Sequence, residues 1–221
     1  MGEFTSSPAD DADGIAAHRV KELVGTGYIS AERAQAIVAA APEARDRIVE
    51  WLRSAAASGD WRTVEKLANL AAHTRPEGLA AVLAPIVADG TAPTNYEDLV
   101  EILGEVADHE RDPEAVPAIV RLMTARMPTD GQAYALSLKA LQALGTIGGA
   151  EAEQALRAIA EDDDHPSQVR WEAAVELGIE DDLGFDEDEM TGPPVRWHEG
   201  DTGEAGPGGH AEADGDRSDP T

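Results

Sequence analysis

Acidic side chains recur at the spacing of helix turns in two stretches of the chain. The carboxylates are Glu97, Asp98, Glu101 and Glu105 in the first stretch, and Glu172 and Glu176 in the second. Residues four apart share one face of a helix, so each stretch predicts a row of carboxylates. Paired carboxylates can act as general acid and base where burial raises the pKa of one of them. No motif predicts a pocket that would bury one, so we interpret both rows as exposed faces with a role in binding.

Two shorter stretches carry metal-ligand residue types. They read Asp-His-Glu-Arg-Asp over residues 108–112 and Asp-Asp-Asp-His over residues 162–165. We expect both to be turns, on opposite ends of helices that are about 20 Å long at a rise of 1.5 Å per residue. The two stretches therefore do not predict a shared metal site, and we expect neither a metal nor another cofactor.

Other catalytic patterns are absent from the sequence. There is no cysteine, which excludes disulfides, thiolate nucleophiles and cysteine-based zinc sites. No Gly-x-Ser-x-Gly nucleophile turn, phosphate loop or dinucleotide fingerprint is present. We therefore predict no catalytic residue and expect a protein that is not an enzyme.

The elements that would position the acidic rows belong to a repeated segment. It begins at Pro42, Pro76, Pro113 and Ala150, which are 34, 37 and 37 residues apart. A branched apolar residue stands six positions into each copy: Ile48, Val82, Ile119 and Leu156. A recurrence of this length predicts an array of helical repeats.

Each repeat predicts two helices joined by a turn. The first helices are expected over 43–57, 77–88, 114–127 and 151–161, and the second over 61–72, 96–107, 132–144 and 167–178. We expect proline at the first helical position, where its missing N–H costs nothing. Three second helices reach a Leu-Gly pair, which predicts a helix stop at Gly104, Gly145 and Gly178.

The ends of the chain depart from the repeat. A helix over 14–24 and a second one capped by Ser30 predict a terminal hairpin. We predict a folded domain over 13–180 (repeats near 42–72, 76–107, 113–145 and 150–178), a disordered N-terminus over 1–12 and an acidic, Gly/Pro-rich disordered tail over 181–221. Ile179, Leu183 and Phe185 suggest a short capping turn, and the stretch from Pro193 to Gly200 is either a short linear motif or a chance cluster of apolar residues.

The last repeats carry a family resemblance over about forty residues, from Ala140 to Gly178. Its features are Ala143-Leu144-Gly145, Gly148-Gly149, Glu153 to Ile159, the acidic turn 162–164 and Val169-Arg170. This stretch resembles HEAT-type repeats, and more narrowly the HEAT-like repeats named after phycobilisome lyases. The resemblance implies an all-α, right-handed α-α solenoid of about five helical hairpins. Proteins of this class are mostly protein-binding scaffolds, and only some are enzymes.

The charge of the chain limits its partners. The formal net charge is −27, and the part before residue 180 carries 30 acidic and 15 basic residues. A field of this sign repels phosphate backbones and anionic lipid, so we expect neither nucleic acid nor membrane as a partner. The absence of a signal segment and of an apolar run of 18 residues predicts a cytoplasmic protein. Arginine far outnumbers lysine, and with abundant alanine this indicates a GC-rich bacterial genome.

These observations lead to one functional hypothesis and two rivals. We expect a protein-binding HEAT-like scaffold whose acidic concave face receives a protein with a basic surface; one form of it is an inhibitor or immunity-type protein. The expected contact residues are Glu97, Asp98, Glu101, Glu105, Tyr134, Trp171, Glu172 and Glu176. The alternative is a lyase-like HEAT-repeat enzyme, or enzyme subunit, that binds a small ligand in the concave face, although no histidine lies within the predicted second helices. A nucleic-acid-processing solenoid would need a basic groove instead.

Overall fold

The computed structural model describes residues 18–25, 29–126, 131–186 and 190, and these residues contain helices and no strand. A helical segment over 18–24 comes first. The helices that follow are α2 (Ala31–Ala40), α3 (Ala44–Ser58), α4 (Trp61–Thr74), α5 (Leu79–Asp89), α6 (Tyr96–Glu110), α7 (Ala115–Ala125), α8 (Gly131–Ile147), α9 (Gly149–Glu161) and α10 (Ser167–Leu177). The predicted all-α class is confirmed, and each predicted pair of helices corresponds to an observed pair from α3 to α10.

Some predictions fall on other parts of the chain. The N-terminal stretch 1–12 and the stretch from Pro193 to Gly200 lie outside the described residues. The described part continues to Asp186, and Ile179 and Phe185 pack against the core there. The guanidinium of Arg170 lies 5.7 Å from the centre of the Phe185 ring. The expected capping turn therefore covers the end of the helices, with Leu183 left exposed.

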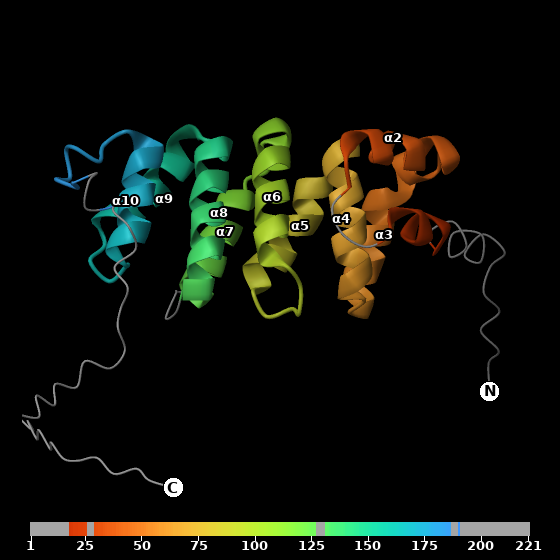
Figure 1. Cartoon of the computed structure of the whole chain (residues 1–221), viewed down its shortest axis with the longest axis horizontal. Coiled ribbons are helices and arrows are strands. Elements are labelled where there is room, and N and C mark those ends of the chain that lie inside the picture. The colour runs from red at the N-terminus through yellow and green to blue at the C-terminus, as the bar shows by residue number, and fades with distance from the viewer. Residues whose placement is uncertain (1–17, 26–28, 127–130, 187–189, 191–221) are drawn as a thin grey trace, which may run out of the picture. The chain divides into compact units, whose positions relative to one another are not determined.

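The helices from α3 to α10 are arranged in two layers. They pack in the consecutive pairs α3–α4, α5–α6, α7–α8 and α9–α10, and helices two places apart in the chain also contact each other, from α3 with α5 to α8 with α10. The odd-numbered helices thus form one layer, and α4, α6, α8 and α10 form the other, side by side in Figure 1. Helix α2 packs against α4. Because alternate helices share a layer, the two predicted acidic rows belong to the same one. None of the described helices is long and apolar enough to cross a membrane.

The apolar residues of the repeat fill the space between the layers. Ile48, Val82, Ile119 and Leu156, which stand at the same place in each repeat, are all buried. Trp51 on α3 is buried as well. The spacing of these residues in the sequence thus marks the buried face of α3, α5, α7 and α9.

Side-chain caps fix where several helices begin. The Ser30 hydroxyl accepts a hydrogen bond from the Arg33 N–H at 3.2 Å, as predicted. Asp60 caps α4 through the Thr63 N–H, also at 3.2 Å. Short polar side chains at these positions satisfy N–H groups that have no partner within the helix.

The predicted place of the prolines was wrong. Helices α3, α5 and α7 begin at Ala44, Leu79 and Ala115, two or three residues after the prolines. In the first repeat the Pro42 carbonyl accepts a hydrogen bond from the Arg45 N–H at 3.2 Å. The prolines therefore belong to a turn before the helix, where the chain needs no donor from them.

Two of the three predicted glycine stops were also wrong. Gly178 ends α10 with φ +64°, in the left-handed region that favours glycine. Helix α6, however, continues past Gly104 to Glu110, and α8 continues past Gly145 to Ile147. A Cβ on Gly104 would lie 2.8 Å from the Cβ of Ala143 and 2.9 Å from its Cα. Gly104 thus allows α6 and α8 to approach closely, which is a tertiary requirement.

Candidate functional site

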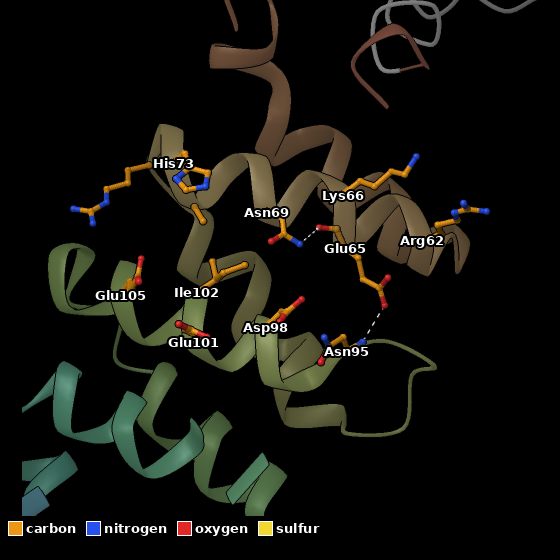
Figure 2. Close-up of a pocket in the computed structure, with 12 residues that line it drawn as sticks. Arg62, Glu65, Lys66, Asn69, His73, Asn95, Asp98, Glu101, Ile102 and Glu105 are labelled. Carbon is orange, nitrogen blue, oxygen red and sulfur yellow. Dashed lines mark hydrogen bonds between the residues drawn. The ribbon is translucent and has the colours of Figure 1, made fainter. Parts of the chain in front are cut away.

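A groove of about 750 Å³ lies between α4 and α6, and we call it the α4–α6 groove. The wall from α4 is polar and mostly basic. Its charged and hydrogen-bonding members are Arg62, Glu65, Lys66, Asn69, His73 and Arg75. In Figure 2, Asn69 and His73 lie on the side of α4 towards the acidic row of α6, whereas the Arg62 and Lys66 side chains extend away from that row.

The α6 wall of the groove contains three of the predicted binding residues. Asp98, Glu101 and Glu105 line it together with Asn95 and Ile102. In Figure 2, Glu105 lies below His73, and Asp98 lies towards the end where Asn95 and Glu65 meet. Glu97, the fourth member of the predicted row, is half-buried and does not line the groove.

The loop that leads into α6 is fixed against both neighbouring helices. A carboxylate oxygen of Glu65 on α4 accepts hydrogen bonds from the Thr94 hydroxyl at 3.0 Å and the Asn95 N–H at 2.9 Å. The Tyr96 hydroxyl accepts a hydrogen bond from the Ala92 N–H at 2.9 Å. The Asn95 side chain caps the helix through the Glu97 N–H. The start of α6, and with it the position of Asp98, is therefore held by α4.

Around Asp98, near the start of α6, carboxylates outnumber the basic groups of the groove. Partial loss of hydration raises the pKa of Asp98 above its ordinary value, and the negative charges of Glu101, Glu65 and Glu97 raise it further. Lys139 on α8 opposes the shift. Its ammonium lies 2.8 Å from a carboxylate oxygen of Glu101, and this hydrogen bond raises the lysine pKa. The groove thus favours an added cation near Asp98.

Four charged groups on the walls of the groove are unpaired. Arg62 and Arg75 on the α4 side, and Asp98 and Glu105 on the α6 side, make no hydrogen bond or ion pair through their side chains with another described residue. Since opposite charges face each other here without meeting, the groove can accept a ligand that bears both donors and acceptors.

The other predicted binding residues form a second group between α8 and α10. Burial and the charge of Glu172 raise the pKa of Tyr134, while a hydrogen bond with Gln168 lowers it. Burial and the charge of Glu176 raise the pKa of Glu172. The carboxylate of Glu176 lies against Gly145. Trp171 is half-buried on α10.

The α4 wall is what the sequence-based prediction missed. Arg62, Lys66, Asn69 and His73 stand at helical spacings of four, three and four residues, which places them on one face. That periodicity is present in the sequence, but the predicted contact residues are acidic or aromatic and include none from α4. The predicted second helices have no histidine in their interior; His73 lies in the last turn of α4, past the predicted end at residue 72, and lines the groove.

The stretches with metal-ligand residue types have structural partners. The carboxylate of Glu110 accepts hydrogen bonds from the Leu79 and Ala80 N–H groups, at 3.1 and 3.2 Å, and so caps α5. Residues 108–110 are helical, so the expected turn begins later than predicted. Asp162 accepts a hydrogen bond from the Asp164 N–H within its own turn. In the described ranges, no three His, Asp or Glu side chains meet in a geometry that could hold a metal ion.

Comparison of the chain with protein-family models, with curated proteins and with solved structures gives no match.

Proposed function

We propose that the chain is a HEAT-like α-solenoid that binds a basic protein partner on its even-numbered helices and has no enzymatic activity. The observation that carries the proposal is the row of Asp98, Glu101 and Glu105 along one wall of a groove of about 750 Å³. The row faces out of the layer formed by α4, α6, α8 and α10, where a partner could reach it. One form of the proposal is an inhibitor or immunity-type protein.

The packing supports a solenoid of stacked helical hairpins. Every second helix contacts its successor within a layer, so each pair of helices buries its apolar face against the pairs on either side. Stacked repeats of this kind create extended binding surfaces, which they use for recognition. The second acidic group, with Tyr134, Glu172 and Glu176, lies on the same layer and would extend the surface towards α10.

The electrostatics support a cationic partner. The part of the chain before residue 180 carries 30 acidic and 15 basic residues. A ligand cation beside Asp98 would offset the repulsion among the carboxylates that raises its pKa. Nucleic acid and anionic lipid would be repelled by the same field.

Affinity capture at low salt tests the proposal. We expect a captured protein of high isoelectric point whose binding weakens with added salt, because exposed charges are screened. Binding should be lost when Asp98, Glu101 and Glu105 are all replaced by lysine. A control with lysine at Glu22, Glu153 and Asp182 makes the same change in net charge at exposed positions outside the groove. Equal loss in both variants would refute the proposed surface.

Removal of the positive charge of Lys139 provides a second test, because it should strengthen the binding of the partner. Its salt bridge with Glu101 is half-exposed, so Lys139→Gln should change the free energy of unfolding by less than about 1 kcal/mol. The substitution releases the Glu101 carboxylate, and the affinity for the basic partner should rise. Unchanged or weaker binding would argue that Glu101 does not contact the partner.

A small-ligand site is the second candidate, and the volume of the α4–α6 groove favours it. A groove of about 750 Å³ falls in the size range of small-molecule sites. His73 lines it as well. Native mass spectrometry of the purified chain tests this alternative, because a retained ligand would appear as a fixed mass above that of the polypeptide.

A further inference from the structure

We propose that the α4–α6 groove binds an extended segment of the basic partner, about six residues long, with two cationic side chains three residues apart that meet Asp98 and Glu105. This inference rests on the proposed function, because it specifies which part of the partner the acidic face receives. It adds the conformation, the length and the charge spacing of the bound segment.

The dimensions of the groove favour an extended chain. Its α4 wall runs from Arg62 to Arg75, which corresponds to about 20 Å at 1.5 Å per residue. An extended segment rises about 3.1–3.4 Å per residue, so about six residues span this length. Packed neighbouring helices lie about 8–10 Å apart, whereas a helix with its side chains is about 10–12 Å wide. A helix of the partner would therefore pack on top of α4 and α6 without entering the groove, whereas an extended segment can enter it.

The free carboxylates set the spacing of the cations. Asp98 and Glu105 are two helical turns apart on one face of α6, about 10.5 Å along its axis. Glu101, between them, is already bonded to Lys139. One metal ion cannot touch both free carboxylates, because its ligands lie within about 2.6 Å. In a polyproline II segment, side chains three residues apart share a face at about 9.3 Å, which matches the separation of Asp98 and Glu105.

The basic ends of the groove suit the backbone of such a segment. A polyproline II chain makes no internal hydrogen bonds, so its carbonyl oxygens remain available as acceptors. Arg62 and Arg75 line the groove at the start and the end of α4, and both are unpaired donors. Arg62 and Arg75 at the two ends of the α4 wall thus suit the backbone carbonyls of a short segment, while its cations meet Asp98 and Glu105 on the α6 wall.

The charge of this chain excludes its own segments as the occupant. Residues 187–221 contain ten acidic and two basic residues, and residues 1–17 contain four acidic residues and no basic one. A second copy would bring a net charge of −27 against the same acidic face. Like charges of this size repel, so the occupant is a segment of a different, basic protein.

Binding of two labelled peptides to the full chain tests the inference. The first probe is acetyl-Ala-Arg-Ala-Ala-Arg-Ala-amide and the second is acetyl-Ala-Ala-Arg-Arg-Ala-Ala-amide, which has the same charge and composition. Fluorescence anisotropy at low salt should show about threefold tighter binding of the first, because only its arginines reach both carboxylates. This factor is within the range of one exposed ion pair.

Paired substitutions then locate the contact. Asp98→Asn with Glu105→Gln should weaken the first peptide about tenfold, the loss expected for two ion pairs. Glu22→Gln with Glu153→Gln removes the same charge from exposed positions outside the groove and should change binding less than twofold. Amide chemical-shift mapping on the unmodified chain gives a second readout that needs no substitution. The shifts should concentrate on α4 and α6.

Each other result overturns the inference. Equal affinity for the two peptides, equal loss in both double variants, or shifts spread over α9 would show that only the general acidic field attracts the peptides. If neither peptide binds while a basic protein is still captured through Asp98, Glu101 and Glu105, the extended segment is wrong and the proposed function stands. If capture also fails, both are wrong.

Discussion

The close approach of α6 and α8 at Gly104 gives the sharpest prediction about stability. An alanine methyl group at this position would lie 2.8 Å from the Cβ and 2.9 Å from the Cα of Ala143. Contacts this short do not occur between real carbon atoms, so the two helices must separate. Since one of the opposing atoms belongs to the backbone, no side-chain rotation can relieve the contact in Gly104→Ala.

Two opposing terms decide the size of the effect. Overpacking in a well-packed interior costs about 1–3 kcal/mol. Alanine is favoured over glycine in a helix by about 1 kcal/mol, which offsets part of this cost. We therefore expect Gly104→Ala to lower the free energy of unfolding by up to about 2 kcal/mol, or roughly 4–8 °C in Tm for a chain of this size.

Gly145 provides a matched control on the partner helix. A methyl group there would meet the carboxylate of Glu176, which is the flexible end of a side chain. That side chain can move, so Gly145→Ala should be neutral or stabilising by up to about 1 kcal/mol. Urea unfolding followed by circular dichroism measures both variants. If Gly104→Ala is more stable than the wild type, or if both variants change stability by the same amount, α6 and α8 do not pack at Gly104 as described.

Two further predictions concern single carboxylates. The pKa of Asp98 is raised in the folded state above its ordinary value of 3.8, so its charge opposes folding at neutral pH. Asp98→Asn should therefore stabilise the protein at pH 7. This gain should disappear as the pH falls through the pKa of Asp98 in the folded state to below 3.8, where Asp98 is protonated in both the folded and the unfolded state. A gain in unfolding free energy that is equal at pH 7 and pH 3.5 in urea unfolding would contradict this. Glu110→Ala removes the acceptor for the first N–H groups of α5 and should cost about 0.5–2 kcal/mol of unfolding free energy. The exposed Asp108→Ala should cost less than about 0.5 kcal/mol, and a cap that acts in this way is ruled out if the two variants are equally stable.

Helix caps and apolar periodicity were readable from the sequence because they are local. The hydroxyl of Ser30 bonds an N–H only three residues away. The branched residue at the sixth position of each repeat is buried in every copy. Such features predicted the helices from α3 to α10 with bounds that differ by a few residues from those observed. The helices that follow the prolines were predicted to start too early, because they begin two or three residues after each proline.

The candidate site was only half predictable. The acidic row on α6 is visible as a spacing of three and four residues, and Asp98, Glu101 and Glu105 do share a wall of the groove. The opposite wall comes from α4, more than twenty residues earlier in the chain. Sequence spacing shows which residues share a helix face but does not show which other helix that face meets.

The sequence by itself determined the helices, the acidic row and the negative charge, since these depend on residue type and near-neighbour spacing. The tertiary structure alone decided that α4 opposes α6 and that Glu110 caps α5 across a distance of thirty residues. It also decided the role of Gly104. The same Leu-Gly pair ends α10 at Gly178 but allows a close contact between α6 and α8 at Gly104. The physical reason is that packing in three dimensions joins residues whose separation along the chain carries no local signal.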